Sequence, residues 1–453
     1  MESISRRKFF KNSMGTIGGL SLSSKFNILK NAPQRRPNIL FILADDLGYG
    51  DLGCYGQKRI KTPNIDKLAD EGMRFTDCYA GSTVCAPSRC CLMTGLHTGH
   101  VRIRGNARLP ILPEDVTVAE VLKDAGYKTG IVGKWGLGEP ESIGIPNKKG
   151  FDYWFGYLNQ RHAHNYYPSV LWQNTRLYFP EIGEYSHDLF TQEGLNFIKN
   201  NKDNPFFLYL AYTIPHANNE LGRAKGNGME VPSDEPYSNE SWPQVEKNTA
   251  AMVTRMDNDI GKIMRLLKEF GLDENTIVFF SSDNGPHKEG GHDHNFFDSN
   301  GPLRGYKRDL YDGGIRVPMI VRWPGHIKAG AVSEQVWAFW DFPQTAAEIA
   351  GTKMPTGLDG ISMLPTILGK YQKDHEYLYW EFHERGFTQA VRMGNWKGVR
   401  PGLDKPIELY DLKTDIGEKN NIAEKHLDIV RRIEEILKNA RTDSKEFPIR
   451  VRK

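Results

Sequence analysis

The sequence predicts an α/β fold in which a large, mostly parallel, doubly wound sheet is followed by a smaller antiparallel sheet near the C-terminus. Two observations predict it. Continuous apolar runs of strand length alternate with amphipathic stretches of helix length, as expected when helices cover both faces of a parallel sheet. From about residue 371, short segments rich in Tyr and Trp replace this alternation, and they are typical of antiparallel strands.

The elements of the main sheet follow in chain order. Apolar runs predict strands at residues 38–44, 73–79, 127–132, 206–213, 277–281 and 315–323. Helical periodicity predicts helices at residues 64–72, 118–125, 188–200, 242–270 and 342–350. A further helix is expected from Cys85, because Pro87 suits a first helical turn and Gly95 a C-terminal stop.

The C-terminal region is expected to form a subdomain. Its predicted strands lie at residues 377–382, 390–399 and 408–412, with a covering helix at residues 429–439. We therefore divide the chain into residues 1–33, a catalytic region at 34–370 and a C-terminal subdomain at 371–453. Two long polar loops, at residues 217–241 and 286–312, are expected to wall a pocket.

Composition narrows the possible functions. The chain has 453 residues and a formal net charge of +3, which gives no basic stripe for nucleic acid. Its five cysteines all lie between residues 54 and 91. An odd, clustered set of this kind is no disulfide framework, so no disulfide is expected.

Residues 1–33 are expected to be an export signal and linker. Arg6 and Arg7 precede a weakly apolar stretch, which is typical of a twin-arginine signal and predicts export to the periplasm. The alternative is a disordered basic arm. No other run of 18 apolar residues occurs, so no membrane span is expected.

Polar residues follow four of the predicted strands directly, at their carboxyl ends. In a parallel sheet these ends meet at one edge, where ligands bind. The residues concerned are Asp45, Asp46, Lys134, His216, Asp283 and Asn284. The aspartates and the asparagine offer only oxygen ligands, which suit a hard cation such as Ca²⁺ or Mg²⁺. Adjacent aspartates after a strand are also common turn formers.

The segment Cys85-Ala86-Pro87-Ser88-Arg89 places a cysteine at a predicted helix N-terminus, with an arginine one turn later. Backbone N–H groups and the helix dipole favour an anion there, so the segment predicts a pocket for a tetrahedral oxyanion. The alternative is a structural cysteine beside a helix cap.

This segment, with Leu92-Met93-Thr94-Gly95 behind it, resembles the signature of the type I sulfatases of the alkaline phosphatase superfamily. Arylsulfatases and N-acetylgalactosamine-6-sulfatases are members of that family. Residues 126–138 resemble its second signature, and residues 303–307 and 312–318 complete the similarity, which runs from about residue 37 to 325. Several motifs in the right order are more specific than any one alone.

The resemblance implies a mechanism and its residues. A maturation enzyme would oxidise Cys85 to formylglycine, whose hydrate attacks the sulfur of a sulfate ester. Arg89, Lys134 and Lys307 would bind sulfate, and His216 would protonate the leaving alcohol. The cation would be held by Asp45, Asp46, Asp283 and Asn284. The family commonly has histidine where this chain has Gly136, which leaves the base for sulfate release open between His164 and His287.

Two loops fall where members of that family contact substrate, at residues 159–167 and 290–294. His164, His292 and Asp293, with nearby Trp172, suit the hydroxyls and ring faces of a sugar. Two alternatives are a plain surface loop and a second metal site formed by His287, His292 and His294.

The sequence thus predicts a formylglycine-dependent sulfatase of alkaline-phosphatase-like fold that removes sulfate from a sulfated saccharide. A phosphomonoester or phosphonate ester hydrolase of the same superfamily is the nearest alternative. A non-catalytic protein that binds sulfated glycans is the second, motivated by Gly136 and by the required modification of Cys85.

Overall fold

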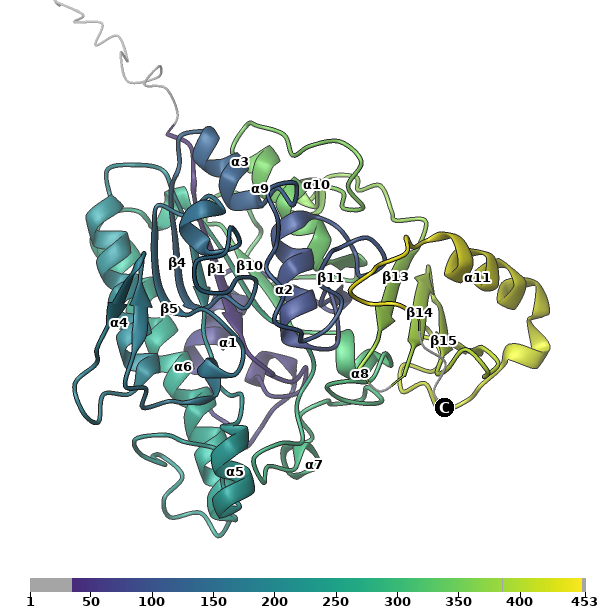
Figure 1. Cartoon of the computed structure of the whole chain (residues 1–453), viewed down its shortest axis with the longest axis horizontal. Coiled ribbons are helices and arrows are strands. Elements are labelled where there is room, and N and C mark those ends of the chain that lie inside the picture. Colours follow the sequence, from purple (N-terminus) through teal and green to yellow (C-terminus); the bar gives the residue numbers. More distant parts are fainter. Residues whose placement is uncertain (1–34, 385, 450–453) are drawn as a thin grey trace, which may run out of the picture. The chain divides into compact units, whose positions relative to one another are not determined.

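Ten strands form the main sheet in the computed structural model, which describes residues 35–384 and 386–449 (Figure 1). Across the sheet the strands are β11 (Ala331–Ser333), β2 (Met73–Phe75), β10 (Met319–Arg322), β9 (Thr276–Ser282), β1 (Asn38–Ala44), β8 (Phe206–Ala211), β4 (Lys128–Lys134), β5 (Tyr153–Tyr157), β6 (Leu171–Gln173) and β7 (Arg176–Tyr178). The five neighbours from β9 to β5 run parallel, whereas β10, β6 and β7 run antiparallel to their partners. The predicted mostly parallel sheet is confirmed.

Two predicted strands differ from the structure. The segment at residues 73–79 divides into β2 and a second short strand, β3 (Cys78–Tyr79), which leaves the main sheet and pairs with β12 (Trp337–Ala338). The strand predicted at residues 315–323 is shortened to β10, because helix α8 (Asp312–Ile315) takes its first residue. Apolar composition identified both segments but could not show which residues find a strand partner.

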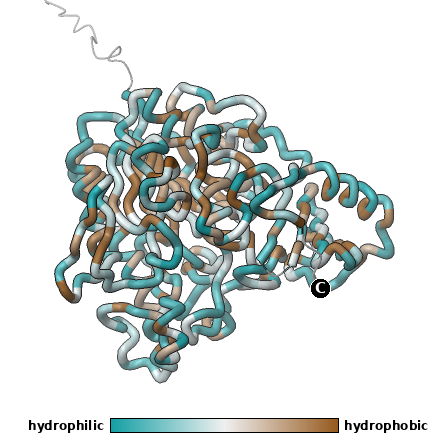
Figure 2. Tube along the Cα trace, viewed as in Figure 1, coloured by the Kyte–Doolittle hydropathy of each residue, from teal (hydrophilic) through white to brown (hydrophobic). Residues whose placement is uncertain are grey.

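Both faces of the sheet are buried, as a doubly wound fold requires. Along β1, Ile39, Phe41 and Leu43 face one hydrophobic cluster, and the residues between them face another. The first cluster is completed by helices α2 (Cys85–Thr94), α3 (Val118–Asp124) and α9 (Phe342–Ile349). The second is completed by α1 (Pro63–Asp70), α4 (Ser186–Asn201) and α6 (Gln244–Glu269). Figure 2 shows hydrophobic residues gathered along the central strands.

The two long segments predicted as loops each contain a short helix. Helix α5 (Asn219–Lys225) lies in the first segment and α7 (His294–Phe297) in the second. The Asn218 side chain accepts a hydrogen bond from Leu221 N–H, and Asp293 accepts one from Asn295 N–H, so each helix has an N-cap. A further short helix, α10 (Leu364–Ile367), follows α9.

The predicted C-terminal antiparallel sheet is confirmed. It consists of β13 (Leu378–Phe382), β14 (Thr388–Met393), β15 (Trp396–Arg400) and β16 (Glu408–Asp411), each antiparallel to the next. The segment predicted as one strand at residues 390–399 is therefore a hairpin. Helix α11 (Leu427–Asn439) lies beside this sheet (Figure 1) and packs Ile433 and Leu437 against Tyr379 and Val391.

Buried polar contacts join this sheet to α8 and to the segment that precedes α2. The Lys397 ammonium lies 2.6 Å from Asp312 Oδ1, and neither side chain is exposed. Trp380 Nε1 donates a hydrogen bond to the Ala80 carbonyl. The C-terminal sheet is thus held against the region from which Cys85 projects.

The described residues from Arg36 onward form one compact unit. The predicted boundary between residues 370 and 371 stays a prediction, and the export signal predicted at residues 1–33 lies outside the described residues. Within the part of the chain that the structure describes, none of the helices has both the length and the apolar character needed to cross a lipid bilayer.

The buried Lys397–Asp312 ion pair should contribute strongly to stability. Lys397→Ala leaves the Asp312 carboxylate without its nearest cation in a buried site, so the free energy of unfolding should fall by about 3–5 kcal/mol. Urea denaturation measures this loss. Lys438→Ala, on the exposed side of α11, should change the value by less than about 0.5 kcal/mol. Equal losses in the two variants would contradict the assigned contribution.

Candidate active site

The polar residues predicted to meet at one sheet edge do meet there. Strands β9, β1, β8 and β4 are consecutive parallel neighbours, so their carboxyl ends lie side by side. Ligand atoms of Asp45, Asp46, Cys85 and His216 all lie within 4.8 Å of one another. Cys85 thus lies beside Asp45 and Asp46 at this edge of the sheet.

The polar residues that follow β1 and β9 are joined by two hydrogen bonds, one from a backbone N–H and one from a side-chain amide. Asp46 N–H donates to Asp283 Oδ1 at 3.1 Å, and Asn284 Nδ2 donates to Asp46 Oδ1 at 2.7 Å. Asp46 adopts a positive φ of 66°, which turns the chain immediately after the strand. Asn284 Oδ1 is buried and has no hydrogen-bond partner among the described residues. An amide oxygen beside Asp46 is thus left available as a ligand.

Cys85 is the first residue of α2, as the sequence predicts. Its Sγ lies 3.4 Å from Asp45 Oδ1, and its side chain is buried. Burial and the Asp45 charge raise the pKa of the Cys85 thiol well above its usual range. Because the thiolate is the reactive form of cysteine, an unmodified Cys85 is a poor nucleophile in this site.

Three buried cations hold the three carboxylates. Arg89 donates from Nε and a terminal nitrogen to Asp283 Oδ2 at 3.0 and 2.9 Å. The ammonium groups of Lys134 and Lys307 each lie 2.7 Å from a carboxylate, that of Asp45 and that of Asp46 respectively. Buried charges are tolerated when they are paired in this way.

The carboxylates still repel one another in spite of these partners. Burial and the neighbouring Asp45 charge raise the pKa of Asp283 to about 7. The three cations are matched by the three carboxylates, so this cluster of described residues offers little surplus positive charge to a further anion.

His216 is neutral in this arrangement. Its Nδ1 lies 2.7 Å from the Ala217 carbonyl, which can only accept, so Nδ1 carries the proton. Its Nε2 lies 3.1 Å from Lys307 Nζ, which can only donate, so Nε2 accepts. Burial and the Lys307 charge lower the pKa of His216 to about 3. Lys307 is therefore the group that carries a proton at this position.

The two alternative bases differ in their surroundings. The His164 ring stacks on His216 with 5.0 Å between ring centroids, and its Nδ1 lies 2.9 Å from Glu220. His287 has both ring nitrogens occupied by backbone groups, those of Pro215 and Glu289. His164 also lines an open cavity of about 980 Å³ together with Asn159, Arg161, His162, Trp172 and Leu177.

The other predicted substrate residues lie apart from this cavity. His292 is buried with Nδ1 2.6 Å from Glu246, and Asp293, half-exposed, caps α7. Their predicted role in binding substrate stays a prediction. Within the described residues the nitrogens of His287, His292 and His294 do not form a group with ligand spacing, and a second metal site there stays an untested alternative.

The structure explains the glycine that departs from the family pattern and identifies a residue that sequence reasoning missed. Gly136 has a φ of 80°, and a Cβ built there would lie 2.1 Å from Gln160 Nε2. Gln160 therefore fills the space that a side chain at position 136 would take. Both polar atoms of the Gln160 amide are buried without a hydrogen-bond partner among the described residues. The glycine was the only sequence signal for this pairing.

Comparison with known proteins agrees with this geometry. A family model described as Sulfatase matches residues 37–352, and one described as N-sulphoglucosamine sulphohydrolase, C-terminal, matches residues 293–443. An N-acetylgalactosamine-6-sulfatase of Rattus norvegicus is 34% identical over 432 residues, covering 85% of this chain and 77% of that protein. An N-acetylgalactosamine-6-O-sulfatase of Bacteroides thetaiotaomicron is 31% identical, covering 90% of this chain and 94% of that protein.

Solved structures share the fold. Ps i-CgsB, solved in complex with k-i-k-neocarrahexaose, is 30% identical with a TM-score of 0.78, covering 88% of this chain and 92% of that one. The phosphonate monoester hydrolase of Agrobacterium radiobacter, 20% identical with a TM-score of 0.64, covers 92% of this chain and 100% of its own and shows likeness of fold alone. Because one family model spans more than half of the sequence and relatives above 30% identity are covered over more than two thirds of their length, this chain belongs to the sulfatase family and is a sulfatase.

Proposed function

We propose that this sulfatase removes sulfate from a sulfated carbohydrate, with Cys85 converted to formylglycine and a divalent cation bound beside it. The observation that carries the proposal is the cluster itself. Cys85 lies 3.4 Å from a carboxylate that also contacts Lys134, within a ring of paired charges. The names of the relatives, which are N-acetylgalactosamine-6-sulfatases, support a saccharide as substrate.

The state of Cys85 argues for its modification. A thiol whose pKa is raised by burial does not supply a thiolate, and a sulfated cysteine would have no route to release its sulfate. The formylglycine hydrate supplies an oxygen nucleophile and a second hydroxyl that expels sulfate as the aldehyde reforms. A formylglycine-generating enzyme is thus an expected partner, and the signal predicted at residues 1–33 would place the product in the periplasm.

The residues at the sheet edge fit a hard cation. The candidate ligands are the oxygens of Asp45, Asp46, Asp283 and Asn284. Oxygen donors of this kind suit Ca²⁺ or Mg²⁺, and the unpartnered Asn284 Oδ1 is the atom that a cation would satisfy. A bound cation supplies positive charge for a sulfate ester, which the balanced side chains do not.

The side chains then have distinct tasks. Lys134 and Lys307 present ammonium groups to the oxygens of the sulfate group, and Arg89 holds Asp283 and the Lys134 carbonyl in place. The hydrogen bond from Lys307 Nζ to His216 Nε2 keeps a proton where a leaving alkoxide requires one. Lys307 would give this proton to the leaving oxygen, and His216 Nε2 would hold the ammonium in place for the transfer.

The open cavity beside His164 is the proposed entrance for the sugar. Its walls combine the Trp172 indole with arginine, asparagine and histidine side chains, a mixture that suits a pyranose face and its hydroxyls. Because His164 stacks on His216, a sugar in this cavity would lie next to the proposed proton donor.

A phosphonate or phosphate ester hydrolase of the same fold is the nearest alternative, since a tetrahedral phosphate would meet the same cations. Turnover of an aryl sulfate and an aryl phosphate by the matured protein separates the two, and a large preference for phosphate would overturn our proposal. A non-catalytic glycan-binding protein is less compatible with membership of a family of sulfatases.

Replacing the modified residue should abolish activity. Cys85→Ala removes the nucleophile, so sulfatase turnover should fall by at least about 10³-fold, while the melting temperature stays close to that of the wild type. Cys54→Ala, outside the site, should retain activity. Mass spectrometry of the Cys85 peptide should show the mass loss that accompanies conversion of a thiol to an aldehyde. Fully active protein that contains only unmodified thiol would refute the assigned nucleophile.

Metal binding should depend on the open amide oxygen. Asn284→Ala removes one ligand, and we expect about 10–100-fold weaker binding of Ca²⁺ by isothermal titration calorimetry, with a smaller Ca²⁺-induced rise in melting temperature. Asn439→Ala, exposed at the end of α11, should bind as the wild type does. Unchanged Ca²⁺ affinity in Asn284→Ala would contradict the assigned site.

Loss of His216 should affect substrates according to their leaving groups. A sugar alkoxide needs a proton to depart, so His216→Ala should lower kcat/KM for a saccharide sulfate by about 10²–10⁴-fold. A nitrophenyl sulfate, whose phenolate leaves unaided, should lose less than about tenfold. His326→Ala, on the surface, should leave both values unchanged. Equal losses on both substrates would exclude a role of His216 in protonating the leaving group.

A further inference from the structure

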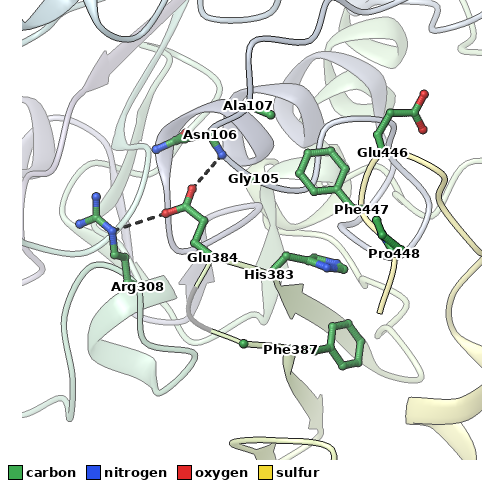
Figure 3. Close-up of a pocket in the computed structure, with 11 residues that line it drawn as sticks. Gly105, Asn106, Ala107, Arg308, His383, Glu384, Phe387, Glu446, Phe447 and Pro448 are labelled. Atoms are coloured by element: carbon green, nitrogen blue, oxygen red, sulfur yellow. Dashed lines mark hydrogen bonds and ion pairs between the residues drawn. The ribbon is translucent and has the colours of Figure 1, made fainter. Parts of the chain in front are cut away.

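We propose that a second pocket beside Cys85 binds a neutral glycosyl unit linked to the sulfated sugar, an inference that rests on the proposed function. The pocket has a volume of about 610 Å³, within the ~300–1,000 Å³ range of ligand sites. Figure 3 shows its walls, which come from four separate parts of the chain. We call this site the C-terminal pocket. Its lining includes Asn106, Arg308, His383, Glu384, Phe387, Glu446 and Phe447.

The C-terminal pocket is joined to the catalytic cluster on two sides. Asn106 Oδ1 accepts a hydrogen bond from Ala86 N–H, next to Cys85, at 3.0 Å. On the other side, Arg308 follows Lys307, and Glu289 contacts both of these side chains. A ligand in this pocket would therefore lie against the walls that position the sulfate group.

The segment 105–108 separates this pocket from the larger cavity beside His164. Residues 105–107 line the C-terminal pocket, whereas Arg108 lines the larger cavity. The two pockets thus flank the same short segment, whose Asn106 holds the start of α2. An oligosaccharide whose sulfated unit lies at Cys85 can extend a neighbouring unit into the C-terminal pocket.

The walls of the C-terminal pocket have an apolar and a polar side (Figure 3). The rings of Phe387 and Phe447 lie on one side, with centroids 5.1 and 5.6 Å from the His383 ring. Glu384 and Arg308 lie on the other, where Glu384 Oε1 accepts from Asn106 N–H at 2.8 Å. An aromatic wall facing hydrogen-bonding groups suits a pyranose ring with its hydroxyls.

The titratable side chains in these walls, those of Arg308, Glu384, Glu446 and His383, already have partners in the protein. Arg308 contacts Glu289 and lies 3.5 Å from Glu384, while Glu446 lies 3.0 Å from Arg102. His383 Nε2 lies 3.0 Å from Glu381. A second sulfate or a uronate carboxylate would have to displace one of these partners, which costs free energy in a half-buried site. The pocket therefore favours a neutral unit over a charged one.

The test compares substrates that share one sulfated sugar. A panel of monosulfated monosaccharides first identifies the sugar that the wild type cleaves best. Its kcat/KM is then compared with that of disaccharides in which the same sugar carries galactose or glucuronate on either side. We expect the better galactose-linked disaccharide to exceed the monosaccharide by about tenfold, and the glucuronate-linked one to show no such gain.

Variants assign the gain to the C-terminal pocket. Phe447→Ala and, independently, Phe387→Ala should lower the ratio of disaccharide to monosaccharide kcat/KM to about one, and Phe179→Ala, a highly exposed ring elsewhere, should keep it. Glu384→Gln, which removes one partner of Arg308, should raise the relative kcat/KM of the glucuronate-linked substrate.

The ratio of disaccharide to monosaccharide kcat/KM distinguishes failure of the glycosyl site from failure of the proposed sulfatase function. If the wild type cleaves a sulfated monosaccharide but the ratio is near one, or is unchanged in both phenylalanine variants, the C-terminal pocket is no glycosyl site and the proposed function stands. If no sulfated saccharide is cleaved, both are overturned.

Discussion

The balance of charge at the sheet edge is the constraint on which the rest of the structure depends. Three carboxylates and three cations are buried together, and each cation lies within 3 Å of a carboxylate. Such a cluster is stable only when every charge keeps its partner, so the strands, α2 and the Lys307 segment are fixed relative to one another. The same balance explains why a sulfate ester needs a further positive charge at this site.

Contacts between the C-terminal sheet and the segments around the cluster hold that cluster in place. Asp312, in the helix that shortens β10, is bound by Lys397 of the C-terminal sheet and by the Tyr79 hydroxyl. Tyr79 in turn belongs to β3, which leads into the segment before Cys85. Residues 300 positions apart, Ala80 and Trp380, are thereby brought into contact at the base of α2. The C-terminal sheet is structural support for the catalytic centre, and the connection between β13 and β14 forms one wall of the C-terminal pocket.

The pairing of Lys307 with His216 alters the chemistry that a histidine at this place suggests. A free imidazole is a natural acid or base near neutral pH, but burial beside an ammonium keeps His216 neutral. In this pair the proton between the two side chains is carried by the Lys307 ammonium, and His216 Nε2 accepts the hydrogen bond. Position 136 shows a similar exchange. The family commonly has histidine there, whereas in this chain the Gln160 amide fills the space beside Gly136.

The sequence by itself determined the doubly wound sheet, the helix that begins at Cys85 and the set of residues at the strand ends, because hydrophobic period, cap residues and short motifs are local properties. It placed 38–44, 206–213 and 277–281 as strands almost to the residue. Only the tertiary structure decided the antiparallel addition of β6 and β7 beside β5, the burial of His292 against Glu246, and the filling of the space at Gly136 by Gln160. Those features depend on which distant side chains come within a few ångströms of one another, and contacts across such sequence separations leave no period or motif in the chain.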